Sequence, residues 1–432
     1  MESEGSIAIA YYSGTPPWRP NEWGSSLTNF SAIIRCVPIF NALRSGHWPS
    51  LLAAWLHFEV SFMTWVLVGA LGVFIAQDFG LTATQKGLLV AVPLLGGSLF
   101  RIGIGVFTDR YGPRRIGLAS MLLAAVPLVW AWLAGHSFSQ MIGVGLLLGV
   151  AGASFAVSLP LASRAYPLAH QGLAMGVAGS GNSGAIISIA MAPLLAVKFG
   201  WHGVFGLLIP VVVVIAAVYW MLARDHEPMD GSAHRREFAL LLREPDTYWF
   251  CVLYAITFGG FVGLSSYLSI FFFDQYGLSR VEASWAAAAC ALAGSFSRPV
   301  GGFIADRCGG LRVLSALYPT TALFTGVASL LLPIPAALAA LFLAMTCLGM
   351  GNGVIFQVVP QRFRQEIGTV SGLVGAAGGL GGFLLPSGLG LLKDLSGTYA
   401  TGFAIFAAVC VLIMPVVMML WRPRLENMVP RI

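Results

Sequence analysis

The 432-residue chain is 57% hydrophobic and only 10% charged, with a formal net charge of +6. Soluble domains carry roughly 25% charged residues, so this composition cannot cover a water-soluble particle of such length and indicates a membrane protein. Because the arginines lie in short segments between apolar runs, the positive charge indicates orientation in a bilayer and argues against a nucleic-acid partner.

The first 50 residues have little membrane-spanning character. They contain Pro16, Pro17 and Pro20, and they lack the basic start, apolar core and small-residue cleavage site of a signal peptide. We expect residues 1–50 to form a mobile cytoplasmic extension. The six cysteines are scattered without a paired spacing or a Cys/His cluster, so the sequence predicts no metal site, no cofactor and no disulfide framework.

The apolar residues come in runs of about 20, the length a helix needs to cross a hydrocarbon core of about 30 Å. Helices are expected because a backbone facing lipid must satisfy its own hydrogen bonds, and no alternation typical of a barrel is present. The sequence predicts twelve spans, at 52–77, 86–107, 115–135, 140–163, 170–197, 201–223, 247–273, 282–305, 311–331, 335–359, 366–392 and 399–421.

A charged stretch at 224–246 divides the spans into two sets of six. The sequence therefore predicts an N-terminal half at 51–223, a central cytoplasmic loop at 224–246, a C-terminal half at 247–421 and a cytoplasmic tail at 422–432.

The distribution of Lys and Arg predicts the orientation. With both termini inside, eighteen of the 24 basic residues fall on the cytoplasmic side. Four fall outside (Lys86, Lys198, Arg280 and Lys393) and two lie within spans. This bias favours cytoplasmic termini in a multi-pass protein of the plasma membrane.

The two halves repeat. Arg101, Gly105, Asp109, Arg110 and Gly112 around the second span have counterparts around the eighth at a constant offset of 197 residues, and these are Arg298, Gly302, Asp306, Arg307 and Gly309. Glycines of the fifth span, from Gly179 to Gly184, match those of the eleventh, from Gly378 to Gly381. Two six-helix halves in parallel repeat place a substrate site near the midplane between them.

Arg101 and Arg298 each lie eight residues before the Asp of their loop, about 12 Å into a span. An arginine at that depth costs at least about 2.5–3.5 kcal/mol to insert, and no acid in the spans is an obvious partner. We interpret the pair as a site for an anion, because the rigid guanidinium fork suits a planar oxyanion. The alternative is that each arginine snorkels to the interface or braces carbonyls of a neighbouring helix.

Glycines gather in spans four, five, ten and eleven. The Gly179, Gly181, Gly184 spacing formally matches a dinucleotide fingerprint, but that motif needs a soluble βαβ unit. Close helix packing is the ordinary explanation. Asn182 and Asn352 lie within these runs, and each would either bind a substrate oxygen or bond another helix.

The loop residues Asp109, Arg110 and Arg115, with Asp306 and Arg307 in the repeat, are expected to form interhelix salt bridges that gate the cytoplasmic side. Glu59 is the one acid well inside a predicted span. It would either carry a coupled proton or serve as a structural partner of a gate arginine.

From about residue 50 to 421 the chain resembles the nitrate/nitrite porter family of the major facilitator superfamily. The resemblance rests on the stretches beginning at Ala151, Tyr166, Gly179, Tyr254, Gly349 and Gly381. It implies a twelve-helix major facilitator fold and an anion held between Arg101 and Arg298 among aromatic rings, which are Tyr254, Phe155, Phe356 and Phe62. The chain departs from some relatives before Phe155, where Gly152-Ala-Ser154 stands in place of a Gly-rich run with Asn.

We therefore expect a lipid-embedded monomer that transports nitrate or nitrite by alternating access, driven by a proton or by exchange against internal nitrite. Two alternatives remain open: a carrier of another small oxyanion or organic anion, and a membrane nitrate sensor. No nucleophile–base pair, metal spacing or nucleotide loop indicates an enzyme.

Overall fold

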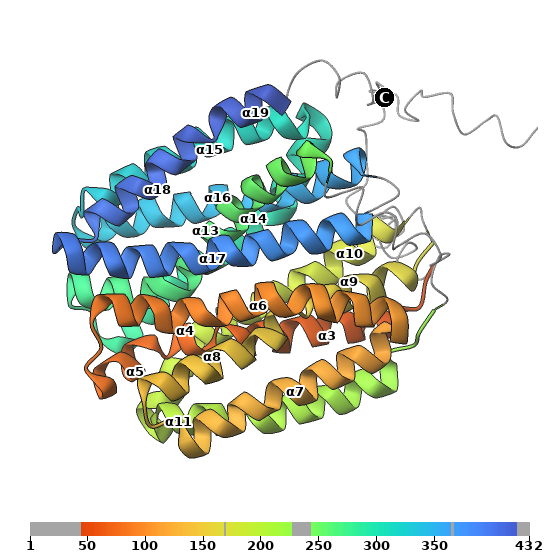
Figure 1. The fold of residues 1–432 in the computed structure, drawn as a ribbon, viewed down its shortest axis with the longest axis horizontal. Coiled ribbons are helices and arrows are strands. Elements are labelled where there is room, and N and C mark those ends of the chain that lie inside the picture. The colour runs from red at the N-terminus through yellow and green to blue at the C-terminus, as the bar shows by residue number, and fades with distance from the viewer. Residues whose placement is uncertain (1–44, 168–169, 227–242, 364–366, 421–432) are drawn as a thin grey trace, which may run out of the picture.

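The computed structural model describes residues 45–167, 170–226, 243–363 and 367–420, and these form a bundle of helices without a strand (Figure 1). The expected extension, the centre of the connecting loop and the tail lie largely outside the described residues. In the first half the helices are α3 (Trp48–Trp65), α4 (Leu67–Ala70), α5 (Gly72–Phe79), α6 (Ala83–Tyr111), α7 (Pro113–Ala134), α8 (Phe138–Gly152), α9 (Phe155–Arg164), α10 (Gln171–Gly179), the 3-10 helix η2 (Ser180–Ser183) and α11 (Gly184–Leu222). In the second half they are α13 (Pro245–Tyr276), α14 (Arg280–Cys308), α15 (Gly310–Ser329), α16 (Ile334–Arg362), α17 (Ile367–Ser396), α18 (Ala400–Leu412) and α19 (Met414–Leu420).

The helices coincide with the predicted spans wherever the chain is described. Among the described residues, eight helical segments are long and apolar enough to cross a membrane by length and composition. The predicted spans 170–197 and 201–223 are joined in α11, which breaks at Gly200 with φ 72° and ψ 158°, a conformation open to glycine. The count of twelve crossings remains a prediction.

The ends of α6 and α14 extend the repeat. Each helix begins with a capping box, Thr82 with Gln85 and Ser279 with Glu282, in which side chain and backbone satisfy each other's free N–H groups. Each ends at a glycine with φ 86°, Gly112 and Gly309. Each residue of α6 named here lies 197 residues before its counterpart in α14, as Thr82 does before Ser279, Gln85 before Glu282 and Gly112 before Gly309.

His47 caps the start of α3, where its ring nitrogen accepts a hydrogen bond from the Ser50 N–H at 3.2 Å. Burial, together with the charges of Arg224 and His226, lowers the pKa of His47. A lowered pKa favours the neutral ring, and only the neutral ring can accept this bond.

Glycines set the closest helix crossings within each half. A Cβ atom at Gly149 would collide with the backbone of α6 at Gly96, and one at Gly349 would collide with the backbone of α14 at Gly294. A Cβ atom at Gly381 would meet the Ala255 carbonyl of α13. Packing is thus the main role of these glycines, as small residues allow in membranes.

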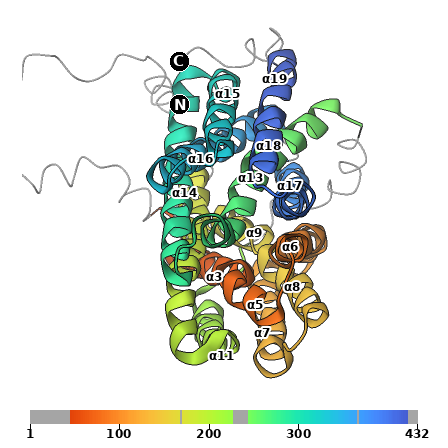
Figure 2. The same ribbon diagram turned by 90° about the vertical axis from the view of Figure 1, so that its left-hand side faces the viewer.

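The two halves meet along α6 with α17 and along α11 with α14. Figures 1 and 2 show α6 and α17 side by side between the warm-coloured first half and the green-to-blue second half. We call the two ends of the bundle the Lys86 end, where α6 begins, and the Asp109 end, where α6 ends.

Polar contacts tie the halves together at the Lys86 end. Lys86 Nζ lies 2.7 Å from Asp274 of α13, and Tyr399 donates a hydrogen bond to the same carboxylate at 2.9 Å. Asp394 of α17 accepts hydrogen bonds from the first N–H groups of α6, at Ala83 and Thr84. Because a helix N-terminus is electropositive, this carboxylate is well placed there.

Candidate functional site

Arg101 lies deep in α6 with 2% of its surface exposed. Its Nη2 donates to the Gly152 carbonyl of α8 at 2.7 Å, and its Nη1 donates to the Gly375 carbonyl of α17 in the opposite half. Its Nε is buried without a partner in the described chain. The carbonyl contacts are those of the bracing alternative, but they leave the positive charge without an anion.

A break between α8 and α9 frees the Gly152 carbonyl, which accepts a hydrogen bond from Arg101. In an unbroken helix the Ala156 N–H would bond the Gly152 carbonyl, four residues back. Here α8 ends at Gly152, α9 begins at Phe155, and the Ala156 N–H bonds Ala153 instead at 2.9 Å. Irregular backbone at membrane depth is tolerated where protein buries it or a cavity accompanies it.

Arg298 approaches from the repeat-related position on α14, where it is half-buried. Its guanidinium carbon lies 5.4 Å from the centre of the Phe356 ring, beside the Tyr254 hydroxyl. The two guanidiniums are close enough to repel each other. Neither forms an ion pair with a carboxylate among residues 45–167, 170–226, 243–363 and 367–420.

Aromatic rings from both halves join the two arginines. The Phe155 ring is 5.6 Å from the guanidinium carbon of Arg101 and 5.3 Å from the Phe356 ring. Tyr254 meets Phe356 edge-on at 5.0 Å. Three of the four rings implied by the resemblance are therefore brought together with both arginines.

Two further rings belong to this cluster and were missed from the sequence. Phe258 stacks on Tyr254 at 5.0 Å and lies 6.0 Å from the guanidinium carbon of Arg101. Phe58 lies 5.9 Å from Phe155. Phe258 is one helical turn after Tyr254, so its spacing was a usable signal.

The other predicted binding residues lie around this cluster. Phe62 contacts Phe58 and Trp65, at 4.7 and 5.2 Å between ring centres, and so forms a second layer. Asn182 is buried in η2. Asn352 is buried on α16, one turn before Phe356, and its Oδ1 has no partner among the described residues.

The predicted gate residues form contacts within one half. Asp109 pairs with Arg164 of α9 at 2.6 Å, while Arg110 lies over Tyr111 and Arg307 over Phe303. Arg115 and Asp306 are exposed. The Asp109 ion pair joins α6 to α9 within the first half, and the gating role of these residues remains a prediction.

Arg114 belongs to the same loop motif as Asp109 and Arg115, and it tethers the start of α7. Its side chain donates to the Trp220 carbonyl at 2.8 Å and lies over that indole ring, and its backbone N–H donates to Asp225. These contacts hold α7 to the end of α11 within the first half.

Glu59 is 8% exposed on α3 and accepts a hydrogen bond from the Ser183 hydroxyl at 2.7 Å. A Cβ atom at Gly184 would collide with the Glu59 carbonyl, so this glycine lets η2 and α11 approach. In the described part of the chain no arginine pairs with Glu59, which leaves its carboxyl beside a neutral donor.

The sequence matches the family model of the Major Facilitator Superfamily over residues 53–386. It is 30% identical to the nitrite extrusion protein of Bacillus subtilis, over 86% of this chain and 94% of that protein. The chain belongs to the nitrate/nitrite porter family of this superfamily. A further member of the family, the probable nitrate/nitrite transporter NarK2 of Mycobacterium tuberculosis, is 35% identical over 83% of this chain and 92% of that protein.

Solved structures agree with the superfamily fold. A bacterial homologue of the human lysosomal transporter Spinster, in an inward-facing and occupied conformation, aligns with a TM-score of 0.66 and 17% identity, over 88% of this chain and 98% of that one. Membership of the porter family makes this chain a multi-pass transporter of the plasma membrane and not an enzyme.

Proposed function

We propose that this porter moves nitrate, nitrite or both by alternating access and binds the anion between Arg101 and Arg298. One observation carries the proposal: a buried guanidinium bonded only to carbonyl oxygens shares one aromatic cluster with a second guanidinium, and neither meets a carboxylate among the described residues. Charges buried in a protein are ordinarily paired, so the arrangement favours a bound anion.

The shape of the cluster supports a small planar anion. Nitrate spreads one negative charge over three coplanar oxygens, which two guanidinium forks can grip from opposite sides. The rings of Phe155, Phe356, Tyr254 and Phe258 exclude water around the arginines and so strengthen the electrostatic attraction. The names of the relatives, a nitrite extrusion protein and a nitrate/nitrite transporter, support the same substrates.

We place both termini in the cytoplasm and count twelve crossings, which puts the Lys86 end outside. The polar contacts between the halves at that end are then those of a protein closed toward the outside. Binding of an anion reduces the repulsion between Arg101 and Arg298, so the halves approach around it. Reopening at the other end releases it.

Uptake needs a driving force, because moving one charge against an inside-negative potential costs about 2.3 kcal/mol per 100 mV. Glu59 is our candidate proton carrier, since its carboxyl is buried beside Ser183 without a cation among the described residues. The alternative driving force is exchange for internal nitrite. The name of the Bacillus relative, a nitrite extrusion protein, supports this alternative.

The test follows labelled nitrate uptake into proteoliposomes, with an inward proton gradient or with internal nitrite. We expect Arg101→Lys and Arg298→Lys to reduce uptake about ten- to a hundredfold, because each loses charge-assisted hydrogen bonds of about 1.5–3 kcal/mol. Arg243→Lys is the matched control, since Arg243 is exposed just before α13.

Each outcome separates the candidates. Gradient-driven uptake that Glu59→Gln abolishes identifies a proton symporter, and uptake that needs internal nitrite identifies an exchanger. Nitrate binding without flux would make the protein a sensor. If the protein transports another oxyanion or an organic anion but neither nitrate nor nitrite, the substrate assignment is wrong. The assignment of the fold would be unaffected.

A further inference from the structure

Three serines of α13 have hydroxyls that the fold does not satisfy. Ser265, Ser266 and Ser269 are at most 2% exposed, and none of the three hydroxyl oxygens has a hydrogen-bond partner in the described chain. We call them the serine face. A buried hydroxyl without a partner costs free energy, so three in five residues of one helix require an explanation.

A serine or threonine hydroxyl in a helix ordinarily donates a hydrogen bond to the carbonyl four residues earlier in the same helix. Thr257 makes this bond on the same helix at 3.3 Å, and Thr64 makes it on α3 at 2.8 Å. The serine face does not, although the same kind of carbonyl is available along α13.

The serine face lies between the arginine pair and the Lys86 end. With 3.6 residues per turn, Ser265 and Ser269 point to the same side of α13 as Tyr254 and lie about 17 and 23 Å beyond it. Ser266 packs on the first half, because a Cβ atom at Gly69 of α4 would be 2.8 Å from its carbonyl oxygen. Ser266 is therefore at the junction of the halves, where α13 packs on α4, α5 and α6.

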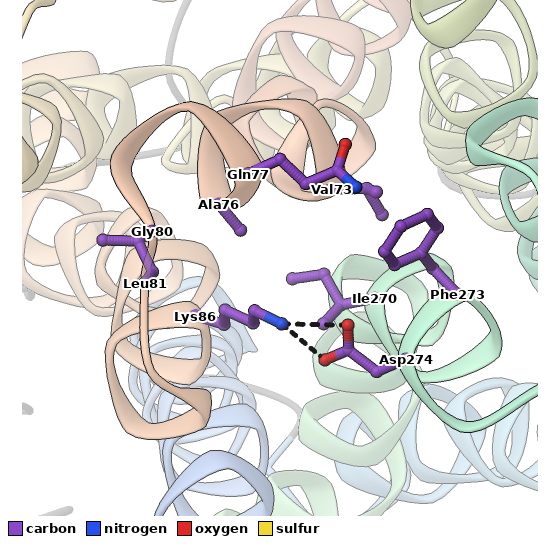
Figure 3. A pocket seen from close by; sticks show the side chains of 9 residues that line it. All are labelled: Val73, Ala76, Gln77, Gly80, Leu81, Lys86, Ile270, Phe273 and Asp274. Carbon is purple, nitrogen blue, oxygen red and sulfur yellow. Dashed lines mark hydrogen bonds and ion pairs between the residues drawn. The ribbon is translucent and has the colours of Figure 1, made fainter. Parts of the chain in front are cut away.

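A cavity of about 90 Å³ continues this line to the Lys86 end. Figure 3 shows Lys86 and Asp274 joined across it, with Val73 and Ile270 alongside. Ile270, which lines this cavity, directly follows Ser269 in the chain, so the serine face begins next to the wall of the cavity.

We infer that the serine face lines the route by which the anion passes between the Lys86 end and the arginine pair, a route closed in this conformation. The inference rests on the proposed function. When the halves part at this end, the hydroxyls donate hydrogen bonds to the passing oxyanion. As neutral donors they guide the anion without holding it tightly, unlike the arginines.

The experiment introduces Ser265→Cys and Ser269→Cys singly into the full-length protein in proteoliposomes. A membrane-impermeant methanethiosulfonate carrying a sulfonate is added to each side in turn, and labelling is measured above that of the native cysteines. Leu395→Cys, 75% exposed at the Lys86 end, reports which side is which. Thr325→Cys is the buried control, since Thr325 bonds within α15, away from the first half.

We expect both serine-face cysteines to react from the same side as Leu395→Cys, about tenfold faster than Thr325→Cys, because transient opening exposes them. Adding Asp274→Asn, which removes the ion pair with Lys86, should increase the rate. The inference is overturned if, in the Asp274→Asn background, the serine-face cysteines react no faster than Thr325→Cys. It is also overturned if they react only from the side opposite to Leu395→Cys. Labelling does not depend on nitrate flux, so failure of the substrate assignment is distinguishable.

Discussion

Phe258 shows how one ring shapes the candidate site. It stacks parallel to Tyr254, with 6° between the ring planes, and faces the Arg101 guanidinium. The ring therefore fixes the position of a tyrosine that lies beside Arg298 and also forms part of the wall around Arg101. Its loss should affect substrate binding more than folding.

We expect Phe258→Leu to raise the KM for nitrate about three- to tenfold, because aromatic and cation–π contacts of about 0.5–1.5 kcal/mol are lost while the apolar volume is largely kept. The measurement is the concentration dependence of nitrate uptake. Phe250→Leu is the control, since Phe250 is buried on the same helix and packs on Phe363. Equal changes in KM for the two variants would contradict a role for Phe258 in the site.

At the scale of helices, glycines determine how closely elements cross. The Gly381 Cα faces the Ala255 carbonyl so closely that a methyl group there would collide with backbone, which cannot move as a side chain can. Gly388 lies two turns further along α17, and a methyl group added to it would have no neighbouring atom within 4 Å. The same helix thus offers both a packed and an open glycine.

We expect Gly381→Ala to destabilise the protein by about 1–3 kcal/mol, the usual cost of overpacking. Gly388→Ala should be neutral or slightly stabilising, because alanine is the better helix former. Thermal unfolding in detergent measures both. A Gly381→Ala protein as stable as the parent would show that α13 and α17 separate without cost.

The sequence was sufficient for the helices, because apolar run length and the 197-residue repeat are local and periodic signals. It also singled out Arg101 and Arg298 as charges within the spans, since charge inside an apolar run is conspicuous; their role in binding remains a prediction. It did not identify Arg164 as the partner of Asp109, because 55 residues separate them and no periodicity links them. The break at Ala153 could not be predicted either, because it depends on the distant Arg101 side chain, which donates a hydrogen bond to the freed Gly152 carbonyl.

At the scale of the whole molecule, the contacts of the Lys86 end hold the halves in one arrangement. The Lys86 and Asp274 side chains are 19% and 17% exposed, so their ion pair is partly shielded from solvent. Arg280 of the second half also lies over Phe74 of the first, 4.7 Å from the ring centre. Removing one such contact should shift the balance between conformations without unfolding either half.

We expect Lys86→Gln and Asp274→Asn each to favour opening at this end by about 0.2–1 kcal/mol. The double variant should add little, because both remove the same contact. Spin labels at Val197 and Leu395, both exposed, measure the distance between the halves. Arg362→Gln, which breaks an ion pair to Asp246 within the second half, should leave that distance unchanged. Additive effects would mean that the two side chains act separately.

If the proposed site is correct, the Gly375 carbonyl has a consequence for affinity, because it occupies the guanidinium assigned to the anion. It acts as an internal competitor: an incoming nitrate must displace an oxygen that the protein itself supplies from α17. The apparent affinity is then the intrinsic affinity multiplied by the fraction of time that Arg101 is free. Since that carbonyl belongs to the opposite half, the grip on the substrate and the closure of the protein cannot be tuned independently.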